Sequence, residues 1–166
     1  SPYARSSGSP IFWTAWGSWV KMLKIHVVAV GKCKESFYRE AAGEYLKRLS
    51  RFAVADVREL PERSSPKEEA ADVLRACRGY VVALAVEGKK LSSEGLAEKI
   101  GKIADAGQET TFLIGSSMGL DGSVKAKADF LLSFSDMTFP HHLMRVMLLE
   151  QLYRAFMINA GSEYHK

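Results

Sequence analysis

The sequence predicts a single-domain α/β protein in which a mostly parallel sheet is flanked by helices. Short apolar, β-branched runs alternate along the chain with stretches whose apolar residues recur at helical spacing. The chain has 166 residues, of which 47% are hydrophobic and 25% charged, so it can bury one core of ordinary size. This composition excludes a disordered chain, a collagen-like repeat and a disulfide-dense mini-protein.

Each predicted element follows from local residue patterns. Apolar and β-branched runs predict the strands, and the run YVVALAV is the most strongly apolar of them. Ser65, Pro66 and Glu68 form a capping box that opens one helix, and Gly79 stops it. The predicted strands are residues 23–30, 52–60, 80–86, 110–114 and 130–134, and the predicted helices are 35–49, 65–78, a helix opened by 91–94, 124–128 and about 142–159.

The last helix is apolar around its whole circumference. Of residues 143–158, 12 of 16 are apolar or aromatic, whereas a surface helix shows one apolar stripe of limited width. We expect one face to pack on the sheet and the other on a second subunit, with Leu149 at an outward apolar position. The same segment carries Arg145, Glu150 and Arg154 and is only 16 residues long, so no membrane span is predicted.

Residues 1–21 differ in composition from the rest of the chain. They hold all three tryptophans, two of the five prolines and no acidic residue, and Met22 is followed by the first predicted strand. We therefore expect an extension outside the domain, either a tag, a mis-assigned start or a targeting remnant, and a domain over 22–166. The domain then carries 21 basic and 19 acidic residues, within a net charge of +4 for the chain. Such a mild excess permits a polyanionic partner without requiring one.

In parallel α/β sheets ligands bind beyond the carboxyl ends of the strands. Three of those predicted ends carry glycine, and the fourth is the turn 135–140. The segment 115–119 lacks both the Rossmann glycine spacing and a Walker lysine, so it is either a plain turn or a close backbone approach to an adenosyl-type ligand.

Neither cysteines nor histidines predict a metal site. Cys33 and Cys77 are too few for zinc and are expected to be reduced structural thiols. His141 and His142 are adjacent but lack the carboxylate spacing of a zinc site, and His26 alternates with core residues and is expected to be structural.

Several motifs resemble the ribosomal large subunit methyltransferase H family, which belongs to the SPOUT class of S-adenosylmethionine-dependent methyltransferases. The resemblance covers residues 22–166 and rests on KIHVVAVGK, KKLSSEGLA, FLIGSSMGL, LSFSDMTFPHHLMRVMLLEQLYRAFMI and the terminal EYHK. It implies an α/β fold with a C-terminal trefoil knot and a homodimer whose last helices pack together. It also implies methylation of N3 of a pseudouridine in large-subunit ribosomal RNA, on assembled ribosomes in the cytoplasm, or in an organelle if residues 1–21 are a targeting remnant.

The resemblance also assigns site residues, with no metal. The cofactor S-adenosylmethionine would contact two strand ends and the segment after the last strand, with Leu84 and Met137 on either side of the adenine. These cofactor residues are Leu84, Gly115, Phe134, Ser135, Asp136, Met137, Thr138 and Phe139. Two positions depart from the family pattern: Ser116 stands where many members have glycine, and His142 stands where proline or glutamine is common, so His142 is expected to be incidental.

The remaining assignments concern catalysis and RNA. The terminal Tyr164 and His165 would form the catalytic pair, with His165 accepting the N3 proton and Tyr164 contacting the base. Asp136 and His141 are alternative proton acceptors. RNA would be bound by His141, Arg145, Arg154 and Lys166, although Arg154 could instead pair with Glu150 one turn away. The competing interpretations are a SPOUT enzyme acting on transfer RNA and a non-catalytic ribosome-binding relative.

Overall fold

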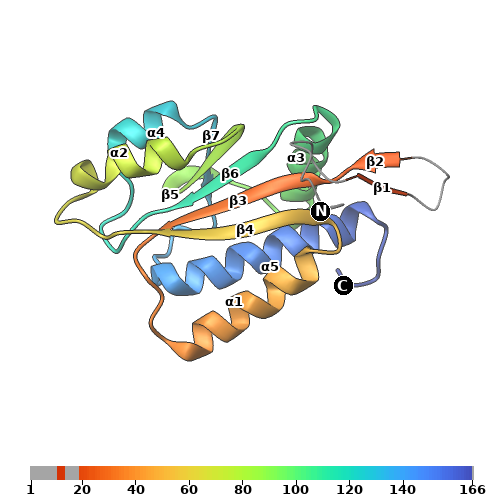
Figure 1. Ribbon diagram of the computed structural model, residues 1–166, viewed down its shortest axis with the longest axis horizontal. Coiled ribbons are helices and arrows are strands. Elements are labelled where there is room, and N and C mark those ends of the chain that lie inside the picture. The colour runs from red at the N-terminus through yellow and green to blue at the C-terminus, as the bar shows by residue number, and fades with distance from the viewer. Residues whose placement is uncertain (1–10, 14–18, 166) are drawn as a thin grey trace, which may run out of the picture.

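The computed structural model describes residues 11–13 and 19–165, with side chains from residue 22 onward. Its centre is a five-stranded sheet of order β4–β3–β6–β5–β7 in which every neighbouring pair is parallel (Figure 1). The strands are β3 (Leu23–Val30), β4 (Ala53–Leu60), β5 (Tyr80–Lys90), β6 (Thr110–Ile114) and β7 (Phe130–Ser133). The helices are α1 (Ser36–Leu49), α2 (Pro66–Ala76), α3 (Ser93–Asp105), α4 (Gly122–Lys127) and α5 (His141–Asn159). The α/β prediction is therefore confirmed.

Two short strands lie outside this sheet. β1 (Ile11–Trp13) and β2 (Trp19–Lys21) pair with each other in antiparallel fashion and with no strand of the five-stranded sheet. The rest of the segment 1–18 lies outside the described residues. The expectation that residues 1–21 form an extension outside the domain stays a prediction.

Helix starts follow the local sequence. The Ser65 hydroxyl accepts a hydrogen bond from the Glu68 amide, with Pro66 at the first helical position, so the predicted capping box is confirmed. Ser92 opens α3 by accepting from the Gly95 amide at 3.0 Å. These caps satisfy amides that would otherwise lack partners in the first turn.

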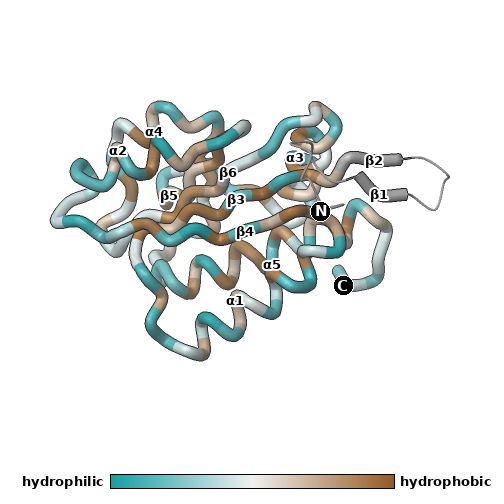
Figure 2. The backbone as a smooth tube through the Cα atoms, in the orientation of Figure 1, coloured by the Kyte–Doolittle hydropathy of each residue, from teal (hydrophilic) through white to brown (hydrophobic). Residues whose placement is uncertain are grey.

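The sheet separates two apolar cores. α1, α3 and α5 cover one face, and α2 and α4 cover part of the other (Figure 1). Apolar colouring follows the central strands, which are buried on both sides (Figure 2). The larger core includes Ile25, Leu49, Ile100, Phe112 and Leu148, and the smaller core includes Val28, Val73, Leu113 and Val124.

Helix α5 is central to its own chain. It packs against α1 on one side and α3 on the other while also reaching the sheet. Leu148, Leu149 and Leu152 are completely buried. The prediction that Leu149 points outward was therefore wrong, because α1 and α3, which are distant in sequence, cover two sides of the helix.

Strand β5 is longer than predicted and runs to Lys90 rather than to residue 86. Its pairing with β7 is irregular between Leu84 and Lys89. A Cβ atom on Gly88 would lie 2.7 Å from the Leu131 carbonyl, so only glycine allows the two strands to approach this closely. The sequence did not predict this extension, because charged residues follow residue 86 and such residues are typical of the end of a strand.

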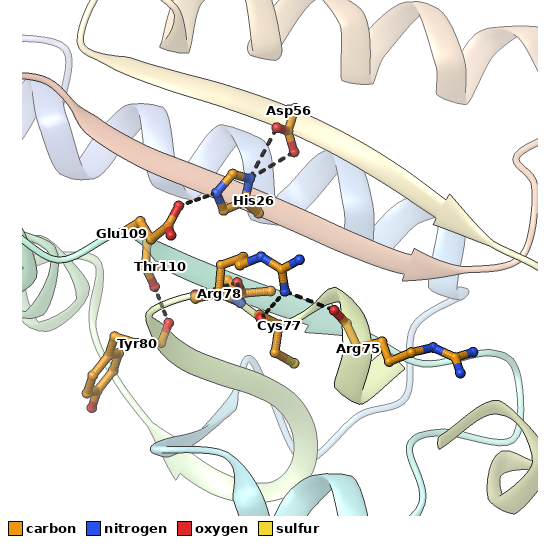
Figure 3. A network of polar contacts seen from close by, with 9 residues as sticks. His26, Asp56, Arg75, Cys77, Arg78, Tyr80, Glu109 and Thr110 are labelled. Atoms are coloured by element: carbon orange, nitrogen blue, oxygen red, sulfur yellow. Dashed lines mark hydrogen bonds and ion pairs between the residues drawn. The ribbon is translucent and has the colours of Figure 1, made fainter. Parts of the chain in front are cut away.

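A polar cluster lies at the amino-terminal ends of the strands (Figure 3). The His26 ring is held between Asp56 on β4, 3.1 Å from Nδ1, and Glu109 before β6, 2.8 Å from Nε2. Thr111 joins β6 to the segment between α2 and β5 by donating to the Arg78 carbonyl at 2.7 Å. The structural role expected of His26 is confirmed.

Candidate cofactor and substrate site

A cavity of about 520 Å³ opens beside the carboxyl ends of β6 and β7 and the part of β5 that continues past its pairing with β6. Its walls include this part of β5 (84–87), residues of the loop after β6 (115–120), the segment after β7 (134–140), and His141 and Met144 of α5. The segments come from four parts of the chain, and the parallel sheet brings them to one edge. The predicted location of a ligand site at the strand ends thus coincides with a real cavity.

The loop after β6 folds back tightly on itself. The Gly119 amide donates to the Ser116 carbonyl at 2.8 Å, and Gly119 adopts a φ of +80°. A Cβ atom on Gly115 would lie 2.5 Å from the Gly119 carbonyl carbon, so a side chain at position 115 would displace the loop itself. Ser116, the departure from the family pattern, is buried, and its hydroxyl lies 3.4 Å from a carboxylate oxygen of Glu69 on α2.

Most of the predicted cofactor residues line this cavity, and one does not. Leu84, Gly115, Phe134, Ser135, Met137, Thr138 and Phe139 are all part of its walls. Asp136 is absent from the walls because its side chain is 81% exposed and pairs with Lys90 of β5. In the same turn the Ser135 hydroxyl accepts a hydrogen bond from the Met137 amide at 3.1 Å.

The cavity fits an adenosyl ligand in size and chemistry. Its volume lies within the range of about 300–1,000 Å³ typical of small-molecule pockets. Leu84 and Met137 lie on separate wall segments and offer apolar surface for the two faces of a purine. Met137 is 72% exposed, which leaves it available to a ligand.

His141 stands on the cavity wall at the start of α5. Burial lowers the pKa of His141, and the neighbouring His142 and Arg145 lower it further. The imidazole is therefore neutral at pH 7 and can accept or donate a hydrogen bond.

Arg145 is a buried structural residue. Its Nη1 donates to Glu59 Oε2 at 2.7 Å, and its Nη2 donates to the Gly31 carbonyl at 3.2 Å. Glu59 also accepts from the Cys33 amide at 2.7 Å. Only 6% of the Arg145 side chain is exposed, so its predicted contact with RNA phosphate does not fit the structure. The loop after β3 covers the guanidinium, and the sequence does not reveal that proximity.

Tyr164 and His165 lie against their own α5 and α3, not at the cavity. The Tyr164 hydroxyl donates to Glu150 Oε1 at 3.2 Å, and Arg154 pairs with the same carboxylate at 2.7 Å. His165 Nδ1 lies 3.0 Å from Arg154 Nη1, and its Nε2 lies 2.7 Å from Glu94 Oε1. Lys166 lies outside the described residues.

This arrangement fixes the histidine tautomer. A guanidinium can only donate, so Nδ1 of His165 is the acceptor and Nε2 carries the proton that Glu94 accepts. Both ring nitrogens of His165 are therefore engaged in this position. The alternative predicted for Arg154, an ion pair with Glu150, is confirmed.

A second groove of about 460 Å³ runs along α5. Val146, Met147 and Gln151 form its floor together with Leu91 and Leu96 near the start of α3. Phe134 lines both this groove and the cofactor cavity, so the two are neighbours. The apolar pattern of α5 is the only sequence signal that could have indicated this groove.

The described residues contain neither a membrane-spanning helix nor a cluster of metal ligands. None of the described helices has the length and apolar character needed to cross a bilayer. Across residues 22–165, no three histidine, cysteine, aspartate or glutamate side chains gather as a metal-binding group.

The chain is an α/β protein of the SPOUT methyltransferase class. A family model described as "Predicted SPOUT methyltransferase" matches residues 23–165. A probable methylase family protein from Haemophilus influenzae shares the fold at a TM-score of 0.50 and 10% identity, covering 82% of this chain and 66% of that one.

Relatives with higher sequence identity identify one family within this class. Proteins named "Ribosomal RNA large subunit methyltransferase H" from Streptococcus suis and Bifidobacterium animalis are 43% and 48% identical to this chain. In both cases the match covers 87% of this chain and all of the relative. The chain belongs to the ribosomal RNA large subunit methyltransferase H family, within the SPOUT methyltransferases.

Proposed function

We propose that this protein uses S-adenosylmethionine to methylate N3 of a pseudouridine in large-subunit ribosomal RNA, on assembled ribosomes in the cytoplasm. Family membership over nearly the whole domain supports methyl transfer, and the names of the full-length relatives support the ribosomal RNA substrate. The observation that carries the proposal is the cavity, which groups seven of the eight residues that the family resemblance assigns to the cofactor.

The chemistry needs few reactive groups from the protein. S-Adenosylmethionine supplies an activated methyl group on a sulfonium. Bound in the cavity, it would give this methyl group to N3 and leave as S-adenosylhomocysteine, while a base of the protein or water takes the N3 proton. Most of the catalysis is then in-line positioning of the two reactants, which a rigid cavity provides. Leu84 and Met137 hold the adenine, and the folded loop at Gly115 sets the depth of the cavity.

In the proposed mechanism, the group that accepts the N3 proton comes from the C-terminal residues Tyr164 and His165 of the other protomer. We propose a homodimer in which α5 packs through the groove lined by Val146 and Met147. Because Phe134 belongs to both the groove and the cavity, a partner seated there reaches the cofactor site. His165, once released from Glu94 and Arg154, accepts the N3 proton in the partner's cavity, while Tyr164 contacts the base. Arg154, Lys166 and His141 contact the RNA.

The test uses ribosomes that lack the modification. Ribosomes from a strain without this gene are incubated with the protein and S-adenosylmethionine, and the modified nucleotide is mapped by mass spectrometry. We expect one new methyl group on a large-subunit pseudouridine. His165→Ala should lose this activity while calorimetry shows unchanged cofactor binding.

Three other results would each contradict one part of this proposal. Methylation of transfer RNA but not of ribosomes would replace the substrate. Absence of cofactor binding in the wild-type protein would identify a non-catalytic ribosome-binding relative. Full activity in His165→Ala would leave His141, Asp136 or solvent as the proton acceptor.

A further inference from the structure

We infer that four rings beside the cofactor cavity form a stacking surface for unpaired nucleotides of the substrate RNA, with Lys32 and Lys34 bound to the flanking phosphates. The rings are Phe37, Tyr38, His142 and His141, called the ring row below. The inference rests on the proposed function for the identity of the RNA. It adds to that function the surface that receives the nucleotides around the target.

The rings of the row follow one another from the protein surface to the cavity wall, and each ring plane is tilted against the next by 53°, 47° and 49° in turn. The centroids of Phe37 and Tyr38 are 4.4 Å apart, those of Tyr38 and His142 are 6.5 Å apart, and those of His142 and His141 are 4.0 Å apart. His141 is itself part of the cavity wall. A nucleotide stacked on this row is therefore next to the place where the methyl group is transferred.

The outer end of the row has no structural task. Phe37 is 62% exposed at the start of α1, although a phenyl ring gains free energy when it is buried. At the inner end, Nδ1 of His142 is buried and has no hydrogen-bond partner among the described residues. A largely exposed phenyl ring is typical of a binding surface rather than of a core.

The chemistry of the row favours single-stranded nucleic acid. Every base has an aromatic face, so stacking on protein rings binds unpaired nucleotides with little dependence on sequence. The lowered pKa of His141 leaves it uncharged at pH 7, which suits contact with a neutral base.

Charge beside the row complements the phosphates. Lys32 and Lys34 are exposed on the loop between β3 and α1, and the charge of Lys32 also acts on Glu59. The start of α1 adds the positive end of a 14-residue helix whose first turn has no side-chain cap. Glu35 and Glu62 also lie near His141, so the surface is of mixed charge and stacking carries the selectivity.

The experiment compares ribosome affinity with cofactor affinity. For Phe37→Ala, we expect the KM for unmodified ribosomes to rise about tenfold, the scale of one lost base stack. Affinity for S-adenosylmethionine, measured by calorimetry, should not change. Phe37→Trp keeps an aromatic face and should restore the wild-type KM.

The two lysines are tested by salt dependence. The double variant Lys32→Ala/Lys34→Ala should lower the slope of log affinity against log salt by about 1.4, the value for two phosphates of single-stranded RNA. Lys47→Ala/Lys102→Ala removes the same charge from exposed positions on α1 and α3 and should leave the slope unchanged. Equal slopes in the two double variants would overturn the phosphate assignment.

Failure of the stacking surface and failure of the proposed function give different results. An unchanged ribosome KM in Phe37→Ala, with an active enzyme, overturns the ring row alone. If the wild-type protein does not methylate ribosomes, the ring row is tested with a fluorescein-labelled single-stranded RNA oligonucleotide. Weaker binding by Phe37→Ala then supports the row, and equal binding overturns it.

Discussion

Arg145 joins the first turns of α5 to the loop that leaves β3 and to the end of β4. Burial alone would raise the pKa of Glu59, but the hydrogen bonds from Arg145 and the Cys33 amide outweigh it and lower that pKa. The pair thus supports folding above the ordinary pKa of glutamate, and this support is lost as the pH falls through the lowered value. These contacts of Arg145 also hold the start of α5 in place, and with it His141, which lies one turn earlier and lines the cavity.

We predict that Arg145→Ala lowers the free energy of unfolding by roughly 3 kcal/mol, because it leaves Glu59 without its partner. This is the low end of the range for buried pairs, since the Glu59 side chain is 36% exposed. Urea denaturation measures the change. Arg48→Ala, which removes an exposed i,i+4 pair with Glu44, should leave the midpoint unchanged. Equal midpoints in the two variants would contradict a structural role for Arg145.

The lowered pKa of His141 gives a second prediction. Between the ordinary histidine pKa of about 6.5 and the lowered value in the folded protein, the unfolded chain binds the extra proton. Stability is therefore fully present above pH 6.5 and declines as the pH falls below it. The urea midpoint should drop from pH 7.5 to pH 5.5 by less in His141→Gln than in the wild type. Parallel pH profiles would show that His141 does not contribute.

Helix α5 contains a fully buried side and a partly exposed side. Leu149 lies in the core between α1 and α3, whereas Met147 faces the groove along the helix. The two positions are only two residues apart, yet the same substitution should have different consequences at each.

At the buried position, Leu149→Ala should lower the free energy of unfolding by about 3 kcal/mol through the lost contacts and the cavity left behind. Chemical denaturation of the purified variant gives the value. A loss below about 1 kcal/mol would mean that the surrounding helices collapse into the space.

At the groove, Met147→Glu should dissociate the proposed dimer while the monomer keeps its fold, because a charge would be buried in an apolar interface. Sedimentation at micromolar concentration should show a wild-type dimer and a variant monomer, with equal circular dichroism spectra. A wild-type monomer would contradict the dimer.

The molecule as a whole has three layers, a sheet between two groups of helices (Figure 1), and the cofactor cavity opens at one edge of that sheet. β1 and β2 form a sheet of their own, and the family model begins at residue 23. The trefoil knot implied by the family resemblance stays a prediction.

Deletion of residues 1–21 should leave the unfolding midpoint, the dimer and methyl transfer unchanged, because the central sheet is complete without them. Thermal denaturation and the ribosome assay check this together. A loss of stability above about 1 kcal/mol, the usual scale of a packing contribution, would show that the segment packs on the domain.

Local patterns in the sequence were sufficient for the elements of the domain. Periods of two and 3.6, glycine stops and capping residues depend on neighbours along the chain, so they predict strands and helices directly. Together with the rule that ligands bind at the carboxyl ends of parallel strands, the same patterns predicted the edge of the sheet at which the cavity opens. The family motifs then named seven residues that line the cavity.

Contacts between distant segments were decided only by the tertiary structure. The burial of Leu149 depends on α1 and α3, and the engagement of Arg145 depends on Glu59, which lies 86 residues away. The outward-facing Asp136 pairs with Lys90 of β5, and His165 is bound by Glu94 of α3, and both partners are distant in sequence. The chemistry of a side chain limits which groups it can bind. Which of those groups lies beside it depends on how the whole chain packs, and that packing is not determined by neighbours in the sequence.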